Sequence, residues 1–68
     1  MIKNINDIII GGFYSYVNQS NCVYIVKVAR VTDKSVFVYS LLNDGTFATT
    51  AHREGFNNFK KYTLQTSI

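Results

Sequence analysis

Residues 22–47 read CVYIVKVARV, TDKS, VFVYSLL, NDG and TF, and this stretch decides the fold class. It contains two runs rich in valine, isoleucine, tyrosine and phenylalanine, each closed by a short polar break. Such side chains pack well on the pleated surface of a sheet. The break Asn43-Asp44-Gly45 offers residues that tolerate the positive φ angles of a tight hairpin. The stretch therefore predicts a β-meander with strands over residues 22–31 and 36–42.

Shorter patterns on either side of this meander extend the prediction to five strands. The added strands are expected at residues 13–17, 46–51 and 59–64, and residues 52–58 break the strand alternation around Gly55, which suggests one helical turn. Residues 1–10 are ambiguous, because their isoleucines fit helical spacing while the run 8–10 fits a buried strand. We favour a helical or coiled lead-in.

Five short antiparallel strands with a helical turn before the last predict an all-β domain, an SH3-like small barrel that spans residues 1–68. An OB-fold is the alternative, although its loops and helix usually need a longer chain. The core is expected to contain the valines of the meander together with Phe37, Phe47 and Phe56. A core of this size rarely supplies more than about 3–5 kcal/mol of stability.

The composition limits how the chain can be stabilised and where it is expected to act. One cysteine, Cys22, excludes an internal disulfide, and one histidine, His52, leaves too few ligands for a structural zinc site. No cofactor or metal is expected. The first residues do not resemble a signal peptide and no apolar run approaches a membrane span, so we expect a cytoplasmic protein without membrane contact.

The residues available for catalysis do not form a convincing set, and we expect a protein that is not an enzyme. Cys22 and His52 lie on different predicted elements, and a lone cysteine in a strand is usually a small buried hydrophobic residue. The four carboxylates show no spacing that suggests paired acid–base work, and no glycine-rich loop precedes a Lys-Ser/Thr pair.

Binding is better supported, because the chain has ten aromatic residues and a net charge of +3. Alternation places Tyr14 and Tyr16 on one strand face, and Tyr24 and Tyr39 are expected to be their neighbours across the sheet. Arg30 is expected on the face of Tyr24, with Lys27 on the opposite face. The candidate binding residues are Tyr14, Tyr16, Tyr24, Arg30, Tyr39, Arg53, Lys60 and Lys61. The simpler alternative is that these tyrosines and lysines only cover the outside of a small barrel.

The order of several short motifs gives the chain a resemblance to a known family. The motifs are Gly12-Phe13-Tyr14, Tyr24-Ile25-Val26, Ala29-Arg30-Val31-Thr32, Phe37-Val38-Tyr39, Gly45 with Phe47, and Arg53 with Phe56. In this order they resemble a bacterial family of short SH3-like domains of unknown function. Tyr16 stands where that family has histidine, Phe47 where it has tryptophan, and the family's proline after its arginine is missing. The resemblance implies a small barrel and no known activity.

Two partner classes remain open at this point. One is a protein partner, which is the hypothesis we favour, in the form of a small bacteriophage or mobile-element protein that docks on a host enzyme and inhibits it. The other is a nucleic acid, bound by tyrosine stacking and by Arg and Lys contacts to phosphate. An open strand edge at residues 13–17 or 59–64 would also allow two copies of the chain to pair as a homodimer.

Overall fold

The computed structural model describes residues 3–65, and strands make up most of their regular structure. Two short helical turns accompany the strands. In chain order the elements are the 3-10 turn η1 (Ile5–Asp7), β1 (Phe13–Val17), β2 (Val23–Val31), β3 (Ser35–Ser40), β4 (His52–Gly55), the helical turn α1 (Phe56–Phe59) and β5 (Thr63–Leu64). No helix in the described part of the chain has the length and apolar character needed to span a membrane.

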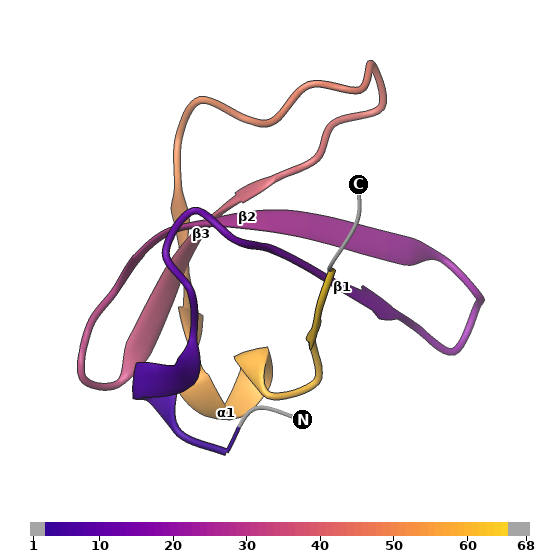
Figure 1. The fold of residues 1–68 in the computed structure, drawn as a ribbon. Coiled ribbons are helices and arrows are strands. Elements are labelled where there is room, and N and C mark those ends of the chain that lie inside the picture. Colours follow the sequence, from indigo (N-terminus) through magenta and orange to yellow (C-terminus); the bar gives the residue numbers. More distant parts are fainter. Residues whose placement is uncertain (1–2, 66–68) are drawn as a thin grey trace.

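The strands form one antiparallel sheet in the order β4-β3-β2-β1-β5 (Figure 1). The prediction of an all-β domain with five antiparallel strands and a helical turn before the last is therefore confirmed. β4 and β5 are the two edges, so the sheet is open. The expectation of an open edge at residues 13–17 is wrong, because β1 pairs with β2 on one side and with β5 on the other.

One face of the sheet, the inner face, packs against η1 and α1, which lie together below β2 in Figure 1. Alternate residues of β1, β2 and β3 point to this side. The buried core consists of Ile8, Tyr14, Val26, Val28, Val36, Val38, Phe59 and Tyr62. The prediction holds for four valines of the meander, whereas Val31 is only partly buried and Val23 is exposed. Phe56 packs against the core while half-buried.

Two of the predicted core residues, Phe37 and Phe47, lie elsewhere. Phe37 stands between Val36 and Val38 on β3, and since both valines are fully buried, alternation turns the Phe37 side chain to the opposite face. Phe47 packs against the ring of Phe13 on that same side, with the ring centroids 5.5 Å apart. We call this second side of the sheet the outer face.

A β-bulge in β2 changes which side chains share the outer face. Val28 pairs with Val38 and Arg30 pairs with Phe37, so Ala29 is an extra residue in the ladder. The side chains of Val28 and Arg30 therefore point to opposite faces although they are two residues apart. The prediction that Arg30 shares a face with Tyr24 is wrong. Arg30 instead lies on the outer face with Lys27, which pairs with Tyr39.

The connection between β3 and β4 is a long loop, which projects above β2 in Figure 1. Its tip is the predicted tight turn, with Gly45 at φ +87° and the Asp44 carboxylate accepting hydrogen bonds from the Thr46 hydroxyl and amide. These bonds lower the pKa of Asp44. The strand predicted at 46–51 is wrong, since a single bridge joins Leu41 and Phe47 and the fourth strand begins at His52.

The ends of the sheet also differ in detail from the prediction. The lead-in was predicted to be a short helix or coil, and it contains the three-residue 3-10 turn η1. Asn4 caps this turn by accepting a hydrogen bond from the Asn6 amide. The strand predicted at 59–64 is shorter, because Phe59 closes α1 and only Thr63–Leu64 pairs with β1. This shortening places Tyr62 in a turn, where its amide donates a hydrogen bond to the Phe59 carbonyl at 3.0 Å.

Candidate functional site

A group of aromatic side chains runs from the core to the surface along the inner face. Tyr14 contacts Phe59 edge-on at 5.2 Å, and Phe59 stacks on Tyr62 at 4.9 Å. Tyr62 in turn meets Tyr16 edge-on at 5.2 Å, and Tyr16 stacks on Tyr24 at 5.5 Å with an interplanar angle of 19°. We call the outer members, Tyr16, Tyr24 and Tyr62, the tyrosine cluster. Each ring thus packs against the next, from the core to the exposed end of the series.

Strand register brings two members of the cluster together. Tyr16 on β1 pairs directly with Tyr24 on β2, which places both rings on the same side of the sheet. Lys61, in the turn after α1, places its Nζ atom 4.4 Å from the centroid of the Tyr16 ring. This distance is within the range of a cation–π contact. The cluster thus combines stacked aromatic surface with one positive charge.

The members of the cluster differ in exposure and in chemistry. Tyr24 is 47% exposed, whereas Tyr62 is 8% exposed. Burial raises the pKa of Tyr62 to about 12, with smaller contributions from the nearby Glu54 carboxylate and from Tyr16 and Tyr24. The Tyr62 hydroxyl therefore keeps its proton at neutral pH. Tyr62 can therefore offer an apolar ring and a neutral hydroxyl group, but it is not an acid–base group poised near pH 7.

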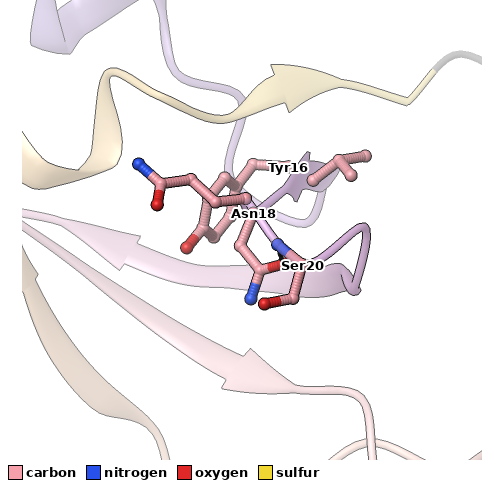
Figure 2. A pocket seen from close by; sticks show the side chains of 5 residues that line it. Tyr16, Asn18 and Ser20 are labelled. Atoms are coloured by element: carbon pink, nitrogen blue, oxygen red, sulfur yellow. Dashed lines mark hydrogen bonds between the residues drawn. The ribbon is translucent and has the colours of Figure 1, made fainter.

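The turn between β1 and β2 is organised by the side chain of Asn18. Its Oδ1 atom accepts hydrogen bonds from the amides of Ser20 and Cys22 at 2.9 and 3.0 Å, and its Nδ2 atom lies 3.4 Å from the Tyr24 hydroxyl. A shallow, open hollow of about 460 Å³ lies at this end of β1. Figure 2 shows Tyr16, Asn18 and Ser20, which line it. The turn fixes the position of Tyr24 relative to Tyr16.

A second hollow, of about 380 Å³, lies between Tyr24 and Tyr62 on one side and the start of the β3–β4 loop on the other. Its rim includes Leu41 and Leu42, which are 37% and 47% exposed, and Val23, which is 59% exposed. Exposed apolar side chains gathered around a concavity are typical of interaction sites. This hollow and the tyrosine cluster together form the candidate site on the inner face.

The structure divides the predicted binding residues between two faces. Tyr16, Tyr24 and Lys61 lie together on the inner face. The Lys60 Nζ atom lies 5.0 Å from the ring centroid of Phe56, which begins α1. Their roles in binding stay predictions. Tyr14 is only 2% exposed, and its hydroxyl accepts a hydrogen bond from the Ile9 amide. The prediction that Tyr14 belongs to an exposed binding surface is therefore wrong.

The other three predicted residues, Arg30, Tyr39 and Arg53, lie on the outer face. The register pairs Arg30 and Arg53 with Phe37, and Tyr39 with Lys27. The expectation that Tyr39 neighbours Tyr14, Tyr16 and Tyr24 is therefore wrong. Tyr39 is two residues from Phe37 on β3, and the valines between and beside them occupy the inner face.

Sequence reasoning missed Tyr62 and misplaced Cys22. Tyr62 was assigned to a strand, and the signal that would have placed it in a turn is the Phe56-Asn57-Asn58-Phe59 spacing of a helical turn, with aromatic residues three apart. Cys22 was expected to be buried, yet it is exposed, because the strand begins one residue later and Cys22 belongs to the turn.

The described residues also show how the potential catalytic groups are placed. Cys22 lies in the β1–β2 turn, while His52 begins β4 and its Nε2 atom lies 3.4 Å from a Glu54 carboxylate oxygen. Among residues 3–65, no three His, Cys, Asp or Glu side chains gather as metal ligands would.

Comparison of the chain with protein-family models, with curated proteins and with solved structures finds no match. The resemblance to the bacterial SH3-like family therefore stays a prediction.

Proposed function

We propose that this protein is a non-enzymatic module that binds a protein partner through the tyrosine cluster and the adjoining hollow. The observation that carries the proposal is the stacked pair Tyr16–Tyr24, which stands beside a hollow rimmed by exposed Leu41 and Leu42. Inhibition of a host enzyme by a phage-encoded chain is a narrower form of this proposal and stays a prediction.

The physical argument rests on how little ordering such a surface requires. Tyrosine presents a large ring with few rotatable bonds, and it is enriched at the centres of protein interfaces. Here Tyr16 is already fixed between Tyr24 and Tyr62, so binding would immobilise few side chains. Apolar partner side chains would fill the hollow, and Lys61 would meet a carboxylate at its rim.

We also propose that the sheet is an SH3-like small barrel. The supporting observations are the strand order, the pairing of β1 with β5, and the helical turn that joins the edge strands β4 and β5. Nuclear Overhauser contacts between backbone protons of β1 and β5 would support this arrangement, in which β4 and β5 remain edge strands. Absence of contacts between β1 and β5 would contradict it.

The binding proposal can be tested with the thiol of Cys22, the sole cysteine of the chain, which is exposed on the edge of the hollow. A benzophenone attached there is irradiated in cell lysate, and adducts are identified by mass spectrometry. We expect one dominant adduct, lost in Tyr24→Ala and kept in Tyr39→Ala, which removes a tyrosine from the outer face. Equal adduct yield from both variants would contradict the proposal.

A further inference from the structure

The outer face of the sheet, which η1 and α1 leave uncovered, carries two rows of aromatic and basic side chains. Strand register places Lys27 between Phe13 on β1 and Tyr39 on β3. In the neighbouring row it places Phe37 between two arginines, Arg30 on β2 and Arg53 on β4. The Phe47 ring adds to the first row through its contact with Phe13.

The basic side chains of this face lie against its rings. The Arg30 guanidinium carbon is 4.2 Å from the Phe37 centroid, and the Lys27 Nζ atom is 5.8 Å from the Phe13 centroid. An Nη1 atom of Arg53 donates a hydrogen bond of 3.5 Å to the Ser35 hydroxyl. The contact of a basic side chain with a carboxylate found among residues 3–65 joins His52 and Glu54, which pair with Val38 and Val36 and therefore face the inner side. Among the same residues, no carboxylate lies within salt-bridge distance of Lys27, Arg30 or Arg53.

The number of cations on this face equals the net charge of the chain. Seven Lys and Arg against four Asp and Glu give +3, and three of the seven cations, Lys27, Arg30 and Arg53, lie on the outer face. The other four cations equal the four carboxylates in number. The carboxylates lie in η1, in the β2–β3 turn, at the tip of the β3–β4 loop, and on the inner face of β4.

We propose that the outer face binds single-stranded nucleic acid. Proteins bind single strands by stacking bases on aromatic side chains while basic groups contact the phosphates, and both groups are present here on an uncovered sheet. Phe37 and Tyr39 are two residues apart on β3, which separates their Cα atoms by about 6.5–7 Å along the strand. Bases would stack on these two rings, with Arg30, Arg53 and Lys27 beside the backbone. This site shares no residue with the tyrosine cluster, so it can fail or succeed independently.

Salt dependence of binding gives the first test. Fluorescently labelled mixed-sequence 12-mers of single-stranded DNA and RNA, with a DNA duplex for comparison, are titrated by anisotropy at several salt concentrations. Three phosphate contacts predict a slope of about −2 for log K against log salt, since each contact to a single strand contributes about 0.7. We expect weaker binding of the duplex. Absence of binding to both single strands at low salt would overturn the proposal.

A pair of double variants separates the outer face from general electrostatics. Arg30→Gln with Arg53→Gln, and Lys60→Gln with Lys61→Gln, lower the net charge equally but on different faces. We expect the first pair to reduce the slope to about −0.7 and the second pair to leave it near −2. Equal loss in both would show that only total charge matters and would overturn the site. Full competition by a polyglutamate peptide would do the same.

The aromatic contribution is tested at Phe37. Loss of one stacked base is expected to weaken binding about 5- to 150-fold in Phe37→Ala, with circular dichroism to confirm folding. Amide shifts of the unmodified protein on addition of the 12-mer do not depend on any variant. We expect them at Lys27, Arg30, Phe37 and Tyr39 rather than at the tyrosine cluster. Shifts confined to the tyrosine cluster would overturn the assignment.

Discussion

The buried hydroxyl of Tyr62 predicts a loss of stability in alkaline solution. Burial raises the pKa of Tyr62 from 10 to about 12 in the folded protein. Below pH 10 the Tyr62 hydroxyl is protonated in the folded and unfolded states, so it does not make the free energy of unfolding depend on pH. Between pH 10 and pH 12 the unfolded chain loses the proton more readily, so stability falls as the pH rises. At pH 11 the difference amounts to about 1.4 kcal/mol.

The measurement is urea unfolding at pH 8 and pH 11, followed by circular dichroism. A loss of about 1.4 kcal/mol lowers the urea midpoint by about 1 M for a protein of this size. Tyr62→Phe keeps the ring stacked on Phe59 but removes the ionisable group. The free energy of unfolding of this variant should therefore fall by about 1.4 kcal/mol less than that of the unmodified protein between pH 8 and pH 11. Tyr24→Phe, at a position 47% exposed, is the matched control and should behave as the unmodified protein. If Tyr62→Phe and Tyr24→Phe lose stability equally, the Tyr62 hydroxyl is not buried as described.

Further predictions concern the core and the turns. Phe59→Ala, at a fully buried position, should lower the free energy of unfolding by about 3–5 kcal/mol and leave the chain unfolded at 25 °C, as measured by circular dichroism. A variant that stays folded would show that Phe59 is not central to the core. Tyr14→Phe removes the acceptor of the Ile9 amide and should lower the free energy of unfolding, measured in urea, by about 1 kcal/mol. Partner binding should not change, and weaker binding would indicate that Tyr14 contacts the partner. Gly45→Ala should lower the melting temperature because φ is +87° there, while Gly55→Ala, in open space at φ −63°, should not; equal melting temperatures would contradict this turn geometry.

Much of the sheet could be predicted from local patterns, because those patterns report directly on backbone preference. The strand at Phe13–Val17 was predicted with its observed bounds, and four valines of β2 and β3 were correctly placed in the core, namely Val26, Val28, Val36 and Val38. The errors arose where alternation is interrupted. The bulge at Ala29 has no sequence signature that separates it from a regular strand residue, yet it moves Arg30 to the other face.

The candidate sites depended more strongly on tertiary structure. Tyr14 and Tyr16 have the same residue type and share a strand face, but Phe59 covers Tyr14 while Tyr16 lies farther along the strand beside Tyr24. Which tyrosine is buried depends on where α1 docks, and alternation along β1 carries no information about this docking. Phe37 is a different case, because its hydrophobic side chain suggested the core although alternation with Val36 and Val38 places it on the opposite face.

The sequence by itself determined the all-β class, the meander and the absence of an internal disulfide, because each follows from residue type and local spacing. Only the tertiary structure decided how the aromatic and basic residues are shared between two faces. Register, one bulge and the docking of a four-residue helical turn separate Tyr16, Tyr24 and Tyr62 from the cations Lys27, Arg30 and Arg53. These features depend on the register between strands and on packing across the sheet, which residue type and spacing along a single strand do not determine.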